Sequence, residues 1–207
     1  VSHPVDLPTG LDFSISHTDE LIVLAVCHQC AVGVDAEPWA DRALPLEVLP
    51  VLLTPAEQQA FGSLPSPAQA QRFFQYWTLK EAHVKALGTG LSHPLTSFSF
   101  DFAPPCRLRF CSPVPRAAGW DFWHFETARH SVAVCARTRG RPALLRARSV
   151  QPLLGSTRMP GMQLPRLIEE GSDLLGADGR LATAVGLRTQ AGDDVGDGGL
   201  EFGIVGK

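Results

Sequence analysis

The sequence predicts an α+β fold in which an antiparallel sheet packs on one long central helix. Residues 72–91 carry apolar side chains at the spacing of one helix face. Most other apolar runs are short and alternate with polar residues or are rich in β-branched residues, as strands are. Gly88 and Gly90 stand where the helix should end, because glycine tolerates the left-handed conformation of a C-cap.

The central helix has two distinct faces. Its apolar stripe consists of Phe73, Trp77, Val84 and Leu87. Thr78, Glu81 and Lys85 follow one another at three- and four-residue steps and share a second face. A surface ion pair is the ordinary interpretation of Glu81 and Lys85. However, the chain has three lysines against fifteen arginines, and Lys80 and Lys85 are two of the three, which indicates a need for ammonium groups here.

The other elements follow from turn and cap signals. Thr54-Pro55-Ala56-Glu57 has the N-cap, proline and glutamate signature of a helix start, and that helix should run to Phe61. A short helix is also expected within residues 44–53. The expected strands are Leu11–Ser16, Leu21–Cys27, Ala31–Glu37, Phe98–Phe102, Arg107–Cys111, Trp120–Glu126 and Ser131–Ala136.

Two parts of the chain differ in composition. Residues 1–148 contain the expected helices and strands and are predicted to form one domain. Residues 149–207 are predicted to be a poorly ordered extension rich in glycine and aspartate, since twelve of the nineteen glycines lie in 151–207. A brief helix over Leu164–Leu175 is the one element expected there.

Charge and hydropathy narrow the class of protein. The formal net charge of −3 does not favour nucleic-acid binding. No run of about 18 apolar residues is present, so a membrane span is not expected. The first ten residues lack a basic segment followed by an apolar one, and we therefore expect a cytoplasmic protein.

The five cysteines are predicted to be reduced. Cys27 and Cys30 flank His28-Gln29, which resembles a tight hairpin turn between two strands, and they would face each other as small apolar residues. A zinc site that also uses Cys106 and Cys111 is the alternative.

Acidic and basic residues gather at two strand ends. Asp35 and Glu37 are two residues apart, so both project from one face of a strand. They could form a solvated strand end or a pair of oxygen ligands for Mg²⁺. Five arginines follow the last expected strand, which is typical of a solvated end but could also attract an acidic partner or a phosphate. They are Arg137, Arg139, Arg141, Arg146 and Arg148.

Three segments carry the most specific pattern. They are FSISH at Phe13–His17, GVDAE at Gly33–Glu37, and Trp77–Leu91, in which WxxKE is followed by a second lysine and then by GxGL. In this order and spacing they resemble the 4′-phosphopantetheinyl transferases that modify peptide and polyketide synthases, and the similarity spans roughly residues 2–136. The family transfers phosphopantetheine from coenzyme A to a serine of an apo acyl or peptidyl carrier protein and releases 3′,5′-ADP.

The resemblance also implies roles for single residues. By position, Asp35, Glu37 and Glu81 correspond to the Mg²⁺ ligands, and Glu81 and Lys85 to catalytic residues. The residues implied in coenzyme binding are His3, Ser16, His17, Lys80 and Lys85. Three carboxylates need a divalent ion to lie together, and Mg²⁺ can bridge a pyrophosphate. A base such as Glu81 could then take the serine proton while Lys85 stabilises the leaving phosphate.

The chain departs from the family pattern near its start. Ser2-His3-Pro4 stands where the family usually has Gly-Lys/Arg-Pro. Members of this type also have an N-terminal half related to the C-terminal one, and we expect most of that half to be missing here. The chain would then be a fragment, or it would borrow a second half from another copy.

Two other functions remain open at this stage. The chain could be a non-catalytic module that binds acidic carrier proteins through its arginines. It could also be another Mg²⁺-dependent phosphoryl-transfer enzyme, such as a pyrophosphate hydrolase, that uses the same carboxylates.

Overall fold

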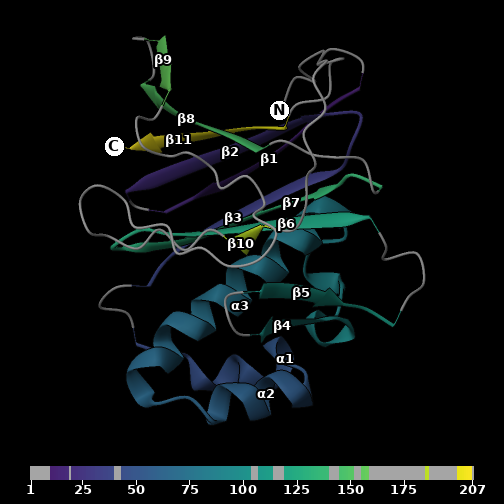
Figure 1. Cartoon of the computed structure of the whole chain (residues 1–207), viewed down its shortest axis with the longest axis vertical. Helices are drawn as coiled ribbons and strands as arrows, with labels where there is room; N and C mark the ends of the chain where they lie inside the picture. The colour runs from purple at the N-terminus through teal and green to yellow at the C-terminus, as the bar shows by residue number, and fades with distance from the viewer. Residues whose placement is uncertain are drawn as a thin grey trace.

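Two β-sheets and a layer of helices stack on one another in this α+β protein (Figure 1). The computed structural model describes residues 10–18, 20–39, 43–103, 107–113, 119–139, 145–151, 155–158, 185–186 and 200–206, and the statements below concern these residues. Each layer buries an apolar face against its neighbour, which is how elements of this kind become stable.

The outer sheet contains five strands. They are β1 (Leu11–His17), β2 (Leu21–His28), β8 (Leu145–Gln151), β9 (Gly155–Arg158) and β11 (Leu200–Gly206). Their order is β1-β2-β11-β8-β9, and every neighbouring pair is antiparallel except β11 and β8, which are parallel.

The second sheet lies between the outer sheet and the helices (Figure 1). Its strands are β3 (Val32–Pro38), β6 (Trp120–Glu126), β7 (His130–Arg137) and β10 (Val185–Gly186), in the order β10-β6-β7-β3. Val132 and Val134 of β7 belong to the core shared with the outer sheet, whereas Ala133 and Cys135 belong to the core that contains the helices. Both faces of β7 are therefore buried, which explains its uninterrupted apolar sequence.

The third layer is helical. It contains α1 (Leu49–Leu52), α2 (Pro55–Gly62) and α3 (Ser66–Leu87), three 3₁₀ turns (Leu46–Val48, Gly90–Ser92 and Leu95–Ser97), and the hairpin of β4 (Ser99–Ala103) and β5 (Arg107–Cys111). The predicted capping box between Thr54 and Glu57 is present at the start of α2. Helix α3 ends at Gly88 with φ 68°, as predicted. In the part of the chain described, no helix is long and apolar enough to cross a membrane.

Serine side chains join the edges of the two sheets. Strand β1 is at one edge of the outer sheet and β3 at one edge of the middle sheet. The hydroxyl of Ser14 accepts a hydrogen bond from Val34 N (3.1 Å), and that of Ser16 accepts one from Ala36 N (3.2 Å). The two hydroxyl oxygens thus accept hydrogen bonds from backbone N–H groups of β3 that no neighbouring strand pairs with. This explains why the buried residues of β1 are polar.

Helix α3 packs against β3 and β7 and approaches β3 very closely at Gly33. A Cβ atom at Gly33 would overlap the backbone carbonyl oxygen of Ala82 and lie 2.8 Å from Ala86 N. A residue with a side chain would therefore push the helix away from the strand. The glycine of the GVDAE segment is needed for packing, and this packing determines how near α3 can come to Asp35.

Lys80 lies in the interior, which corrects the expectation that it contacts the coenzyme. Its side chain is 0% exposed, and its ammonium donates to Glu57 Oε2 (2.8 Å) and to the carbonyl oxygens of Leu95 (2.8 Å) and Phe98 (2.9 Å). Those three acceptors use all three donors of the group. Burial lowers the pKa of Lys80, while the Glu57 carboxylate opposes that shift. Lys80 thus ties α3 to α2 and to the segment before β4.

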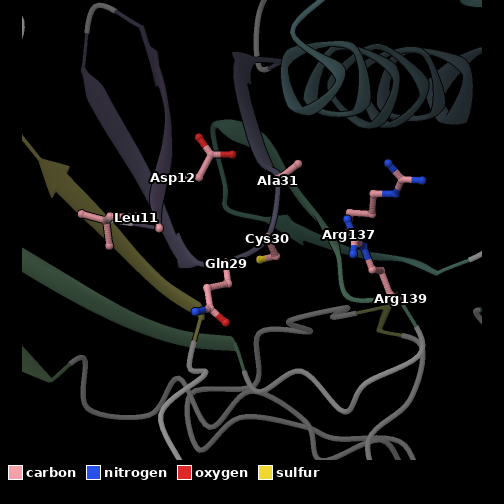
Figure 2. A pocket seen from close by; sticks show the side chains of 8 residues that line it. Leu11, Asp12, Gln29, Cys30, Ala31, Arg137 and Arg139 are labelled. Carbon is pink, nitrogen blue, oxygen red and sulfur yellow. The ribbon is translucent and has the colours of Figure 1, made fainter. Parts of the chain in front are cut away.

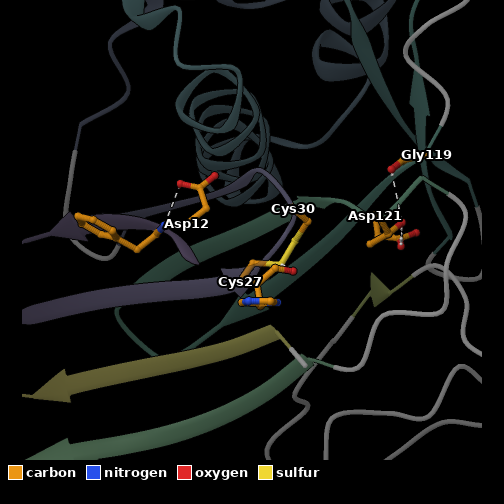
Figure 3. Close-up of a disulfide and its surroundings, with 8 residues drawn as sticks. Asp12, Cys27, Cys30, Gly119 and Asp121 are labelled. Atoms are coloured by element: carbon orange, nitrogen blue, oxygen red, sulfur yellow. Dashed lines mark hydrogen bonds between the residues drawn. A yellow bond between two sulfur atoms is a disulfide. The ribbon is translucent and has the colours of Figure 1, made fainter. Parts of the chain in front are cut away.

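The connection between β2 and β3 differs from the prediction in two respects. The strands belong to different sheets, so residues 29–31 cross between layers and do not form a hairpin turn. Cys27 and Cys30 form a disulfide (Figure 3) and are not reduced thiols. Their Cα atoms are 5.8 Å apart, within the range that a disulfide spans. The alternative zinc site would need these two thiols free, and Cys106 lies outside the described residues.

Part of the segment predicted to be a poorly ordered extension forms strands. Residues 200–206 make up β11, which pairs with both β2 and β8. The run Leu200-Glu201-Phe202-Gly203-Ile204 alternates in polarity, and this local period was hidden by the glycine-rich average composition. The predicted boundary between residues 148 and 149 falls inside β8. The helix expected over Leu164–Leu175 lies outside the described residues.

The close approach at Gly33 predicts a strong effect of Gly33→Ala. The added methyl group has no space against the backbone of α3, so we expect a loss of about 3 kcal/mol or more in the free energy of unfolding. Urea denaturation followed by circular dichroism measures it. Gly62→Ala is the matched control, because no atom lies within 4 Å of a Cβ there. A Gly33→Ala protein as stable as the control would contradict the packing described.

The buried pair of Lys80 and Glu57 predicts a second stability effect. Lys80→Met leaves the Glu57 carboxylate buried without its partner, and breaking a buried pair in this way costs about 3–5 kcal/mol. Because Glu57→Gln removes the remaining charge, the double variant should unfold at higher urea concentration than Lys80→Met alone. A double variant that is less stable than the single one would argue against charge burial as the cause.

Candidate active site

Strand β3 presents two carboxylates to helix α3. Alternation along the strand puts Gly33, Asp35 and Glu37 on the face that meets the helix, and Val34 and Ala36 on the face toward the outer sheet. Asp35 is buried, with 4% of its surface exposed. Glu37, two residues further, is half-buried. The prediction that both carboxylates lie on one face of a strand agrees with this register.

Lys85 brings together the three elements that form the site. Its ammonium lies 2.7 Å from Asp35 Oδ1, 3.1 Å from Ser16 Oγ and 3.1 Å from the carbonyl oxygen of Val34. Helix α3 thus meets β1 and β3 at one point. The side chain of Lys85 is 32% exposed, whereas that of Lys80 is 0% exposed. This contact also differs from the surface ion pair with Glu81 that its spacing on the helix would suggest.

Glu81 lies one helical turn before Lys85, and the carboxylates of β3 affect its pKa. Burial raises the pKa of Glu81, the negative charges of Asp35 and Glu37 raise it further, and the Lys85 ammonium lowers it. The charges of Asp35, Glu37 and Lys85 thus act on the ionisation of Glu81. Its ionised form is less favourable than that of an ordinary glutamate, and added positive charge would favour it.

The carboxylates are chemically suited to a hard cation. Among the described residues, no group of three or more His, Cys, Asp and Glu side chains is already arranged to hold a metal ion. However, Asp35 Oδ2 is buried and has no hydrogen-bond partner within the described part of the chain. Carboxylate oxygens are the ligands that Mg²⁺ prefers. A cation here would engage the unpartnered oxygen and relieve the repulsion around Glu81.

The residues near β1 that were predicted to contact the coenzyme differ in their position relative to the carboxylates. Ser16 is buried within the cluster, where its hydroxyl donates to Asp35 Oδ1 (3.0 Å) and accepts from Lys85 and Ala36. His17 is exposed on the opposite face of the same strand. His3 lies outside the described residues. Of Ser16 and His17, only Ser16 joins the carboxylates and Lys85, and it does so by positioning them.

Sequence reasoning overlooked His130. Its Nε2 lies 3.2 Å from Thr18 Oγ1, which links the residue after His17 to the start of β7. Desolvation lowers the pKa of His130, and the charge of Glu20 opposes that shift. No motif marks this histidine, because its role depends on a strand pairing between distant segments. It holds the end of β1 beside the site.

The raised pKa of Glu81 predicts that Glu81→Gln stabilises the protein at neutral pH. A carboxyl whose pKa is higher in the folded state than in the unfolded chain costs stability once the pH rises through its folded pKa. Below the ordinary carboxyl pKa both states are protonated, and the cost vanishes. We therefore expect Glu81→Gln to unfold at higher urea concentration than the natural protein at pH 7, with little difference at pH 3.5.

Glu47→Gln is the control for this measurement, because Glu47 is exposed. It should change the unfolding midpoint little at either pH. A Glu81→Gln protein less stable than the natural one at pH 7 would mean that the neighbouring carboxylates do not repel Glu81.

Comparison with known proteins gives a family model and several similar sequences. Residues 31–135, about half of the chain, match the family model of the 4′-phosphopantetheinyl transferase superfamily. The 4′-phosphopantetheinyl transferase HetI of Nostoc sp. is 38% identical over 88 residues, which cover 41% of this chain and 35% of that protein. The 4′-phosphopantetheinyl transferase gsp of Aneurinibacillus migulanus is 32% identical over 91 residues, covering 44% and 37%.

The matched segment spans little more than a third of the length of these curated relatives. Among solved structures, a holo-(acyl-carrier-protein) synthase from Bacillus anthracis in complex with CoA (3′,5′-ADP) superposes with a TM-score of 0.44 at 15% identity, covering 51% of this chain and 93% of that one. The family match includes β3, α3 and most of β7, the elements that carry the carboxylates and Lys85. The chain belongs to the 4′-phosphopantetheinyl transferase superfamily.

Proposed function

We propose that this chain catalyses the Mg²⁺-dependent transfer of the 4′-phosphopantetheine group from coenzyme A to a serine of an apo acyl or peptidyl carrier protein. The observation that carries the proposal is the contact of Lys85 with Asp35 at 2.7 Å, beside a Glu81 whose pKa is raised by burial and by the charges of Asp35 and Glu37. Membership of the family supports this reaction class. The relatives that match are named as transferases of this kind but are longer proteins.

The reaction needs a base for the serine proton and a positive charge beside the leaving phosphate, and residues of the chain can provide both. The oxygen of the carrier serine forms a bond to the phosphorus that bears pantetheine, and the bond from that phosphorus to the oxygen of 3′,5′-ADP breaks. Glu81 is proposed to take the serine proton as the general base. Lys85 is suited to stabilise the charge that develops on the leaving phosphate.

The proposed Mg²⁺ would be held by Asp35, Glu37 and Glu81. When bound, it would neutralise these carboxylates and polarise the pyrophosphate of the coenzyme. Ser16 and the carbonyl of Val34 hold the Lys85 ammonium beside Asp35, and the side chain of Lys85 is 32% exposed. His17, exposed at the end of β1, is proposed to contact a phosphate of the coenzyme. His3 is proposed to do the same.

A mass measurement tests the proposal. The chain is incubated with coenzyme A, Mg²⁺ and an apo carrier protein, and the carrier is weighed. We expect the carrier to gain one phosphopantetheine group and to gain none when Mg²⁺ is omitted. Asp35→Ala and Glu81→Ala should each lower the rate by about 100-fold or more, the usual effect of losing a main electrostatic contact.

Glu47→Ala is the matched control, since it removes an exposed carboxylate on another element. It should keep the full rate. Carrier that binds but stays unmodified would favour a carrier-binding module. Hydrolysis of coenzyme A without any carrier would favour a pyrophosphate hydrolase. Either of these results would refute the transferase proposal.

A further inference from the structure

A cavity lies beside the start of β1, at the opposite end of the strand from Ser16 (Figure 2). It has a volume of about 300 Å³ and is lined by Gly10, Leu11, Asp12, Gln29, Cys30, Ala31, Arg137 and Arg139. A strand rises about 3.3 Å per residue, so Asp12 lies roughly 13 Å along β1 from Ser16. The cavity is therefore separate from the carboxylates and Lys85, and what it binds does not depend on the proposed transfer reaction.

The backbone around this cavity is held in uncommon conformations. Gln29 (φ 58°) and Arg139 (φ 54°) are the non-glycine residues with positive φ in the described part of the chain, and both line the cavity. The Cys27–Cys30 disulfide fixes the turn that carries Gln29 (Figure 3). Gly119 accepts a hydrogen bond from Arg139 N (2.9 Å) and comes so close that a Cβ on it would lie 2.6 Å from Arg139 Cα. Strained residues of this kind gather at binding sites, where surrounding structure maintains them.

The two arginines bring positive charge that the described residues do not neutralise. Arg137 Nε is buried and has no hydrogen-bond partner among them, and its guanidinium lies 5.9 Å from the centre of the Trp120 ring. Within the same residues, neither Arg137 nor Arg139 forms an ion pair. The Asp121 carboxylate on the paired strand β6 accepts instead from Thr138 Oγ1 (2.6 Å). Charge-assisted hydrogen bonds from guanidinium groups to phosphate or carboxylate oxygens are strong, so an anion that reaches these two arginines would be stabilised here.

Asp12 adds a second requirement on the ligand. Figure 2 shows Asp12 on one side of the cavity and the two arginines on the other, with Cys30 and Ala31 between them. One oxygen of Asp12 accepts from Phe13 N (2.9 Å), and no described residue donates a hydrogen bond to the other. A simple anion would be repelled by Asp12, whereas a molecule that also carries an ammonium or hydroxyl group could donate to it.

We propose that this cavity binds a small molecule with a phosphate or carboxylate group at Arg137 and Arg139 and an ammonium or hydroxyl group at Asp12. The volume limits the ligand to a few heavy atoms beyond the anionic group. The arginine run that begins at the last residue of β7 thus contributes two residues to this proposed site and is not only a solvated strand end.

Calorimetric titration of the full chain at constant ionic strength tests the site. The probes are phosphoethanolamine and β-alanine, which pair an ammonium with a phosphate or a carboxylate, and inorganic phosphate and acetate, which lack the ammonium. Phosphoethanolamine or β-alanine should bind at least about tenfold more tightly than its matched anion, since a charged hydrogen bond is typically worth that much. The tighter of the two identifies the anionic group.

Three variants assign the binding to this cavity. Arg139→Asn removes the guanidinium but suits the positive φ, and it should weaken the tighter probe about tenfold. Asp12→Asn should tighten inorganic phosphate and remove the advantage of the ammonium probes. Arg109→Asn, a matched loss of an exposed arginine on β5, should change affinity less than twofold.

Lys85→Gln distinguishes the cavity from the candidate active site, and it should leave all four affinities unchanged. The proposal is overturned if no probe binds saturably, if Arg109→Asn weakens binding as much as Arg139→Asn, or if Lys85→Gln abolishes it.

Discussion

The contact between the Lys85 ammonium and the Asp35 carboxylate, 2.7 Å long, is the interaction on which the candidate site depends. It joins a helix to the edge of a sheet at a place where Gly33 lets the two backbones touch. It also balances the charge of a carboxylate that is almost completely buried. Without it, the repulsion of Glu81 by Asp35 and Glu37 would be stronger.

Helix α3 uses its two lysines for different purposes, and the difference follows from the faces on which they lie. The ammonium of Lys80 donates to three acceptors in the interior and has no donor left. That of Lys85 also has three acceptors, but the side chain is partly exposed. A compact group with three donors suits both settings better than the planar fork of arginine. This explains why a chain rich in arginine places lysine at these two positions.

Much of the fold could be predicted from sequence because it depends on local pattern. The cap at Thr54, the end of α3 at Gly88 and the strands from Leu11 to Glu37 all follow from spacing and turn residues. The pairing of the strands could not be predicted in this way, because periodicity shows which face of a strand is buried but not which strand lies beside it. For that reason the β2–β3 connection was mistaken for a hairpin, and the pairing of β11 was missed.

The candidate site, like the fold, could be predicted only where it depends on local pattern. Periodicity predicts that Asp35 and Glu37 share one face of a strand, and that Glu81 and Lys85 share one face of a helix. The resemblance of the motifs to the family predicts that these two faces meet. The interior position of Lys80 required knowledge of Glu57 and of two carbonyl groups far along the chain, which no local signal provides. The same holds for His130 and Thr18.

The central claim is that the carboxylates from β3 and α3 converge on one divalent cation beside Lys85. A crystal structure with coenzyme A and Mn²⁺ in place of Mg²⁺ tests it most directly, because the anomalous signal of manganese locates the ion without reference to the protein. The account predicts one strong peak ligated directly by Asp35, Glu37 and Glu81. A peak bound elsewhere, or coenzyme bound with no ion between these three side chains, would contradict it.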